Sequence, residues 1–179
     1  MLELLNLKDI NKKYGIKPAL KNINLNIESG KIIGVLGPNG SGKTTMIKII
    51  AGLLKPSSGI ITIDGHKPGE ITKSYVAYLP DKDFLDINMS IDDTIKIFAD
   101  FYADFDISVA YRLLEDLQVQ YKSKIKTLSK GNRKKIMLML VMSRRAKLYV
   151  LDEPIAGVDP VAGNYILNTI ISNYNKTST

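Results

Sequence analysis

Residues Gly37–Thr44 read GPNGSGKT, which fits the phosphate-binding loop pattern G-x-x-x-x-G-K-[ST]. The run Lys31–Leu36 before the loop is apolar and of strand length, so we expect a strand there. The run Thr45–Leu54 after the loop has the apolar spacing of a half-buried helix, which Lys55 and Pro56 would end. A strand, a glycine loop and a helix in this order are the context that the pattern needs. The stretch therefore predicts a site for nucleotide phosphates.

Each residue type in the loop suits that chemistry. The glycines lack a Cβ, so the backbone can take positive φ angles and approach a phosphate closely. The loop N–H groups and the N-terminus of the following helix form an anion-binding nest. Lys43 carries a charge for the outer phosphates, and Thr44 offers a hydroxyl to Mg²⁺, which prefers oxygen ligands. The alternative, a chance glycine turn before a helix, is expected in fewer than about one chain in a hundred.

Length and composition set the broad class. The chain has 179 residues, enough for one domain with a core, or one core with a smaller lobe. Its 45% hydrophobic and 24% charged residues are typical of a folded globular protein and disfavour disorder. The chain has no cysteine, which excludes disulfides and cysteine-based zinc sites.

Charge and hydropathy bear on location and partners. Charges appear too early in the N-terminal residues for a signal peptide, and the longest apolar stretch, Ile136–Met142, is too short to cross a bilayer. We therefore expect a cytoplasmic protein without a membrane segment. The net charge is +7, but the lysines are scattered and only Arg133–Lys135 forms a cluster. No nucleic-acid partner is expected, because nucleic-acid binders concentrate their charge in a stripe; a general attraction to polyanions or acidic membranes fits equally well.

Hydrophobic periodicity outlines an α/β protein. Alternating or apolar runs predict further strands at Leu2–Ile10, Leu20–Ile27, Ile60–Ile63, Tyr75–Leu79 and Lys147–Leu151. Helical spacing predicts a helix after Ser90 as N-cap, and others over Ile107–Leu117, from Ser129 to about Arg145, and after Asp159. The layout is an α/β core, residues 1–87 and 146–179, interrupted by a helical subdomain at 88–145.

The run Leu148–Glu153 is an apolar strand that ends in two carboxylates. Strands of open α/β sheets deliver functional groups at their C-terminal ends. Asp152 suits Mg²⁺, and Glu153 suits a general base that activates an attacking water. A pair of solvated acids at a strand end is an equally good explanation of this run alone. The phosphate loop upstream favours the functional interpretation.

Four segments in a fixed order resemble the ATP-binding subunit of ABC transporters: Gly37–Thr45, Leu128–Asn132, Leu148–Glu153 and Gly157–Pro160. The segment Leu128–Asn132 is similar to that family's signature motif, a serine and glycine loop that opens a helix, and it is the most diagnostic of the four. The resemblance covers essentially the whole chain. Lys130 before the signature glycine is similar to the pattern of small bacterial ABC-2 and bacitracin-efflux-like exporters.

The resemblance implies a fold and a function. The expected fold is a P-loop NTPase (RecA-like) core sheet with an N-terminal antiparallel β-subdomain and an inserted helical subdomain, as one domain over 1–179. The implied activity is ATP binding and hydrolysis with Mg²⁺, which energises a membrane transporter. The implied partners are a transmembrane permease subunit and a second ATPase subunit, packed head to tail. The implied location is the inner face of the cell membrane.

The resemblance also assigns roles to residues. Glu153 is the implied catalytic residue, and Thr44, Asp81 and Asp152 are the implied metal ligands. Implied ATP contacts are Tyr14, Gly37, Pro38, Asn39, Gly40, Ser41, Gly42, Lys43, Thr44, Thr45, Ser129 and Gly131. Tyr14 would stack on adenine, although an ordinary strand-end tyrosine is the alternative. Ser129 and Gly131 would bind the γ-phosphate of ATP held by the other subunit. Asp159 would lie at the dimer interface, act as helix N-cap before Pro160, or do both.

The chain departs from the family pattern at several positions. Asp81 stands where the family usually has a glutamine, but an aspartate can also bind Mg²⁺. Lys130 replaces a glycine of the signature, and Asn132 replaces its usual glutamine or glutamate.

The family's switch histidine lies on a strand after the last helix, beyond Thr179, and the only histidine here, His66, is in a turn. The resemblance thus implies a C-terminally truncated subunit. It would lack a central strand between those bearing Lys43 and Asp152, so we expect lower stability or a gap filled from another molecule.

Two alternatives stay open. A non-transport ABC ATPase of DNA repair, chromosome organisation or translation would carry a long coiled coil, zinc cysteines or a second cassette. This chain has only a modest helical stretch between Asp81 and Ser129, no cysteine and one cassette. The other alternative is a nucleotide-binding module that does not turn over.

Overall fold

Residues 3–172 and 179 are described by the computed structural model. They fall into two units. The first holds the chain up to Ala77, with Ala146–Val150 and Thr179, and the second holds Tyr78–Arg145 and the chain from Leu151 to the end of the last helix. The helical subdomain predicted at 88–145 lies within the second unit.

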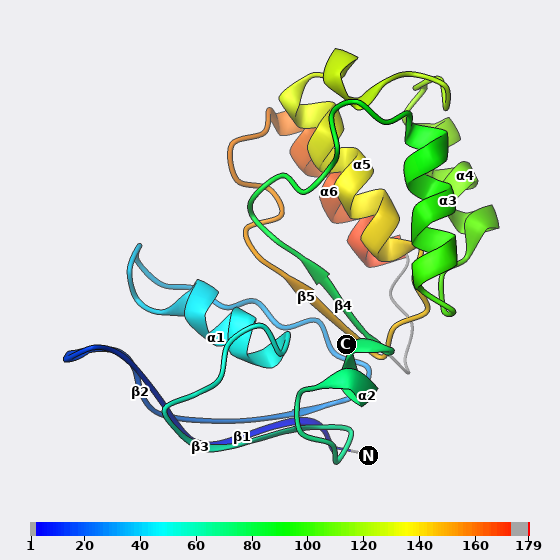
Figure 1. Cartoon of the computed structure of the whole chain (residues 1–179). Coiled ribbons are helices and arrows are strands. Elements are labelled where there is room, and N and C mark those ends of the chain that lie inside the picture. Colours follow the sequence, from blue (N-terminus) through cyan, green and yellow to red (C-terminus); the bar gives the residue numbers. More distant parts are fainter. Residues whose placement is uncertain (1–2, 173–178) are drawn as a thin grey trace. The chain divides into compact units, whose positions relative to one another are not determined.

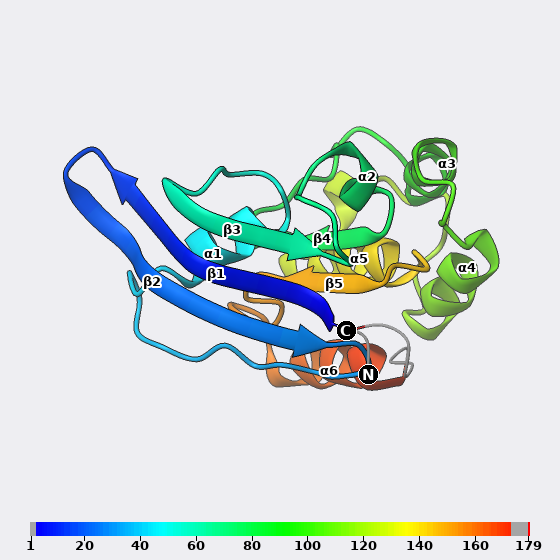
Figure 2. The same cartoon turned by 90° about the horizontal axis from the view of Figure 1, so that it is seen from below.

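The first unit contains a three-stranded antiparallel sheet. Its strands are β1 (Glu3–Tyr14), β2 (Lys17–Glu28) and β3 (Ser58–Ile63), in the order β2-β1-β3 (Figure 2). Leu7 of β1 pairs with Leu25 of β2 on one side and with Ile61 of β3 on the other. The apolar side chains of β1 are buried, as the alternation in the sequence predicts. This sheet is the predicted N-terminal antiparallel β-subdomain.

Helix α1 (Lys43–Ile50) follows the phosphate loop as predicted. Its buried residues are Met46, Ile49 and Ile50. The helix ends four residues before the predicted end at Leu54, because Gly52 takes a φ of 71° and turns the chain. A short helix, α2 (Glu70–Lys73), lies between β3 and β4.

The strand predicted at Lys31–Leu36 does not form, and this prediction is wrong. These residues lie outside helices and strands, and the side chains of Ile32, Ile33, Val35 and Leu36 are between 43% and 96% exposed. An apolar run becomes a strand only where a neighbour pairs with its backbone and covers its side chains. At the start of the run, the Lys31 N–H donates to the Thr179 hydroxyl at 3.3 Å. This hydrogen bond goes to a side chain, whereas a strand would pair with the backbone of a neighbouring strand.

Strands β4 (Val76–Leu79) and β5 (Leu148–Leu151) form a second sheet. The Tyr75 carbonyl accepts the Leu148 N–H, and the Leu79 carbonyl accepts the Asp152 N–H. Because both partners advance by four residues, the two strands are parallel. Thr179 extends the pairing of β5, since its N–H donates to Lys147 O and its carbonyl accepts the Tyr149 N–H.

The second unit is mainly helical. Its helices are α3 (Ile91–Phe101), α4 (Ile107–Asp116), the 3₁₀ turn η1 (Ile125–Thr127), α5 (Lys130–Met142) and α6 (Pro160–Ser172). Helix α5 contacts α3, α4 and α6 (Figure 1) and every residue from Ile136 to Met142 is buried. Helix α5 is therefore the core element of this unit.

Side-chain caps begin three of these helices where the sequence predicts. Ser90 Oγ accepts the Asp93 N–H at 3.1 Å, and Ser129 Oγ accepts the Asn132 N–H at 3.2 Å. Asp106 caps α4 by accepting the N–H groups of Ser108 and Val109. Among the residues that the structure describes, no helix combines the length and apolar character needed to cross a membrane.

Candidate functional site

The phosphate loop takes the backbone conformation that its glycines predict. Gly40 and Gly42 have φ angles of 82° and 95°. Gly42 is the N-cap of α1, and a Cβ there would lie 2.5 Å from the Ala19 carbonyl oxygen. Both the φ angle and the contact require glycine at position 42. The loop is exposed and leads directly into the N-terminus of α1, which favours anions.

Lys43 folds back over the loop. Its Nζ donates to the carbonyl oxygens of Gly37 at 2.7 Å and Pro38 at 2.9 Å. The Ser41 N–H closes the turn by donating to the Pro38 carbonyl at 3.2 Å. The positive charge is thus held against the same loop that would surround a phosphate. Thr44 lies exposed in the first turn of α1, where its hydroxyl could reach a cation.

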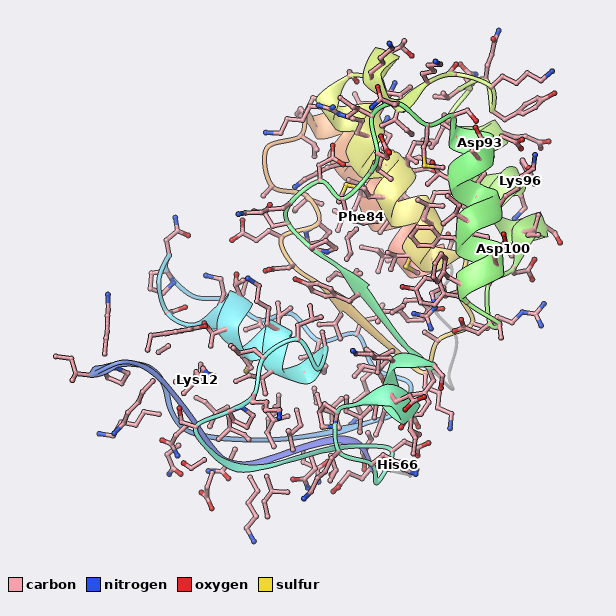
Figure 3. All side chains as sticks on the ribbon, in the orientation of Figure 1. Lys12, His66, Phe84, Asp93, Lys96 and Asp100 are labelled. Atoms are coloured by element: carbon pink, nitrogen blue, oxygen red, sulfur yellow. The ribbon has the colours of Figure 1, made fainter. Side chains whose placement is uncertain are left out.

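Tyr14 ends β1, and its side chain is 53% exposed. Lys12 Nζ lies 5.5 Å from the centre of the Tyr14 ring and donates to the Lys55 carbonyl at 2.8 Å. Figure 3 labels Lys12 on the β1–β2 hairpin. An exposed ring at a strand end fits both adenine stacking and an ordinary strand-end tyrosine, so the stacking role stays a prediction.

Asp152 and Glu153 follow β5 directly, with different environments. Asp152 is only 3% exposed, whereas Glu153 is exposed. Glu153 has a φ of 49°, the left-handed region that residues with a Cβ seldom adopt. Burial raises the pKa of the Tyr78 hydroxyl, and the charges of Asp152 and Asp81 raise it further. Asp81 follows the C-terminal end of β4 and Asp152 follows that of β5, the end at which strands of open α/β sheets deliver functional groups.

The oxygen donors fit magnesium. Mg²⁺ is usually held by one or two carboxylates together with phosphate oxygens and water. Asp152 and Asp81 in the second unit, and Thr44 in the first, each offer oxygen atoms of this kind. Among the described residues, no group of three or more acidic, histidine or cysteine side chains gathers to form a metal site by itself. Asp152 suits the ion best because it is buried at the strand end. The metal roles of these residues stay predictions.

The signature segment lies at the N-terminus of α5. Ser129 is its N-cap and is exposed, and Gly131 lies in the first turn. The backbone N–H groups of this turn and the helix dipole favour an anion. The anion-binding role of Ser129 and Gly131 stays a prediction.

One functional candidate, Lys134 of α5, is not evident from the sequence. Its Nζ donates to the carbonyl oxygens of Glu153 at 3.2 Å and Ala156 at 2.7 Å, and it lies 3.6 Å from Asp81 Oδ1. The sequence shows only the basic cluster Arg133–Lys135. No signal in this cluster distinguishes Lys134 from its two neighbours, because its partners are distant along the chain.

Asp159 and His66 lie where the sequence predicts. Asp159 immediately precedes α6, and its carbonyl accepts the Gly163 N–H at 2.9 Å, so it occupies the predicted N-cap position before Pro160. His66 is exposed in the turn after β3, where Figure 3 labels it, and its Nδ1 lies 2.8 Å from the Asp64 carbonyl oxygen. The interface role of Asp159 stays a prediction.

Comparisons with known proteins agree with the motifs. The family model described as ABC transporter matches residues 20–156. The zinc import ATP-binding protein ZnuC of Wigglesworthia glossinidia brevipalpis is 37% identical over 96% of this chain, and the ATP-binding protein YtrB of Bacillus subtilis is 30% identical over 98%. A putative ABC transporter ATP-binding protein from Pyrococcus furiosus has the same fold, with a TM-score of 0.85, 30% identity and coverage of 97% of this chain and 87% of its own.

The chain spans only part of several relatives. It covers 71% of ZnuC, 61% of YtrB and 10% of the mouse organic anion transporter ABCA8A, which is 34% identical over 90% of this chain. The predicted fold class, a P-loop NTPase with an antiparallel β-subdomain, is confirmed by the fold neighbours. The predicted resemblance to ABC transporter ATP-binding subunits agrees with the matching family model and with the names of these relatives.

Proposed function

Because the chain belongs to the ABC transporter family, we propose that the whole protein binds and hydrolyses ATP and thereby energises a membrane transporter. The observation that carries this proposal is the phosphate loop. Its glycine φ angles, its position before α1 and the Lys43 ammonium over it support the binding of a nucleoside triphosphate there.

Different residues of the chain bind the phosphates, the adenine and the metal ion, and activate water. The phosphate loop and Lys43 bind and neutralise the phosphates, and Tyr14 stacks on the adenine. Thr44, Asp152 and Asp81 hold Mg²⁺, which neutralises charge on the phosphates when bound. Glu153 orients a water molecule and accepts its proton at a carboxylate oxygen. The exposure of Glu153 and the burial of Asp152 support this division.

We further propose that two copies act together, head to tail. The support is the second anion site, formed by Ser129 and Gly131 at the exposed N-terminus of α5. In the assembly, this turn binds the γ-phosphate of an ATP molecule whose other phosphates lie in the phosphate loop of the second copy. Asp159 lies at the interface between the copies.

The remaining partner is a transmembrane permease, which places the protein on the inner face of the cell membrane. Family membership supports this partner. The name of ZnuC refers to zinc import and that of ABCA8A to organic anions, so relatives at similar identity serve different cargoes. The substrate is therefore left open in this proposal.

The test is ATP binding and hydrolysis by the full chain, with Lys43→Ala beside Lys48→Ala. Lys48 lies exposed on the same helix. Lys43→Ala should weaken binding of a fluorescent ATP analogue by about a hundredfold or more, because a charged hydrogen-bond donor to phosphate is lost. Lys48→Ala should bind as the wild type does. Equal binding by both variants, or no Mg²⁺-dependent phosphate release by the wild type, would contradict the proposal.

A further inference from the structure

Lys134 joins three segments of the second unit through one ammonium group. Its side chain is only 12% exposed. Nζ reaches the turn after β5 through the carbonyl oxygens of Glu153 and Ala156, and the loop after β4 through Asp81. Figure 1 shows both loops and α5. The ammonium donates two hydrogen bonds, to the two carbonyl oxygens, and forms an ion-pair contact at 3.6 Å with Asp81 Oδ1.

The turn that Lys134 holds is strained. Glu153 has a φ of 49°, in the left-handed region, although it carries a Cβ. The Ala156 N–H donates to the Glu153 carbonyl at 3.1 Å, so this carbonyl accepts from both Ala156 and Lys134. A residue with a Cβ keeps a left-handed conformation only where its surroundings enforce it. Lys134 supplies that constraint directly at the main chain of Glu153.

The loop after β4 is tied to the same helix turn. Asp83 Oδ2 lies 3.3 Å from Arg133 Nε, although the geometry there is not that of a hydrogen bond. The next residues are anchored in the unit, because Leu85 is buried and the Phe84 ring lies 6.0 Å from the Phe98 ring. Two acids of the loop thus face two cations of α5. Asp81 is the more exposed partner, at 54%, and is free to respond to a cation or ligand.

We propose that Lys134 is a positioning residue, which holds the main chain of Glu153 in place and couples that hold to Asp81. The proposal rests on the proposed function, in which Glu153 activates water and Asp81 binds the metal. When Asp81 turns towards another partner, Lys134 loses one of the three oxygen atoms near its ammonium group. The hydrogen bonds from Lys134 to the turn after β5 then change.

The first test is hydrogen exchange of the full chain, followed at the Ala156 amide. Lys134→Met should raise the exchange rate there by about tenfold, because the turn loses its constraint. Lys134→Arg keeps the charge and the donors and should stay within about threefold of the wild type. Lys126→Met, which removes an exposed lysine of the same unit, should leave the rate unchanged. Equal rates in Lys134→Met and the wild type would overturn the link, whether or not ATP is hydrolysed.

The second test is steady-state ATP hydrolysis by the same variants. Lys134→Met should lower kcat by about ten- to a hundredfold and leave KM for ATP within about twofold, because misplacing a base affects the transition state more than binding. Lys134→Arg should recover most of the loss. Wild-type kcat in Lys134→Met would refute the positioning role while the proposed function stands. A wild type without hydrolysis would refute the proposed function, and exchange at Ala156 would still decide the link.

Asp81→Asn tests the coupling from its other end. Asp81 is exposed, so this variant is expected to fold even if Lys134→Met does not. It should raise Ala156 exchange by about threefold, and adding Lys134→Met should then have a smaller effect than it has in the wild type. Additive effects of the two substitutions on exchange would show that Asp81 and Lys134 act independently, which would overturn the coupling.

Discussion

The phosphate loop of the first unit and the turn after β5 of the second both hold charged groups at sharp bends, by different means. In the loop, the bend depends on glycine φ angles, and Lys43 bonds to carbonyls only five and six residues away. In the turn, a residue with a Cβ takes a left-handed φ, held by Lys134 from 19 and 22 residues away. A site built from local backbone can be recognised in a short motif. A site held by distant side chains cannot.

The largest effect is expected from a substitution in the phosphate loop, whose conformation depends on the local backbone. Gly42→Ala should weaken ATP binding by more than about a hundredfold, because its Cβ would meet the Ala19 carbonyl at 2.5 Å and its φ of 95° is strained. Gly40→Ala has a similar φ but open space around its Cβ, and should cost about tenfold. Titration with a fluorescent ATP analogue measures both. Equal losses in the two variants would show that the close approach to Ala19 is unimportant.

The next prediction concerns a long-range pair in the second unit. Arg144 is 5% exposed, and its Nε and an Nη donate to both carboxylate oxygens of Asp104, at 2.9 to 3.2 Å. Asp104→Ala should lower the free energy of unfolding by about 3 kcal/mol, because it removes the carboxylate partner of a buried cation. Chemical denaturation measures this loss.

Asp100→Ala is the matched control. Asp100 lies exposed on α3, as Figure 3 shows, and its removal should change the free energy of unfolding by less than about 0.5 kcal/mol. If Asp104→Ala were as mild as Asp100→Ala, the second unit would not depend on its long-range charge pairs.

The smallest effect is a pH dependence. Hydrogen bonds from the Arg145 side chain, then the Val109 backbone N–H and the Ser108 side chain, lower the pKa of Asp106 to about 2. Because this pKa is lower in the folded than in the unfolded chain, the stabilisation is complete above about pH 4 and is lost as the pH falls towards 2. Melting temperatures of the wild type should fall more steeply over this range than those of Asp106→Asn. Parallel curves would contradict the assignment.

Local patterns predicted much of the fold. The alternation in β1 and β2, the serine caps at Ser90 and Ser129, and the glycine loop each involve residues close in sequence, so the pattern carries the physical cause. The apolar run before them also placed Asp152 and Glu153 at the end of β5. These elements were all predicted within a few residues of their observed bounds.

Long-range contacts account for what the sequence did not predict. Lys31–Leu36 is as apolar as β5, yet it forms no strand, whereas β5 pairs with β4 and with Thr179. The difference lies in the neighbours, which no local pattern encodes. Lys134 resembles part of a solvated basic cluster in the sequence because its partners, Asp81 and Glu153, are distant along the chain.

The most direct test of the central claim compares Glu153→Gln with the wild type in ATP affinity and in a single turnover of bound ATP. A base that activates water acts in the chemical step, so the variant should bind ATP within about threefold of the wild type and hydrolyse it about a hundredfold or more slowly. Gln keeps the size of the side chain, so the turn after β5 should persist. Hydrolysis by Glu153→Gln at the wild-type rate would contradict this role of Glu153.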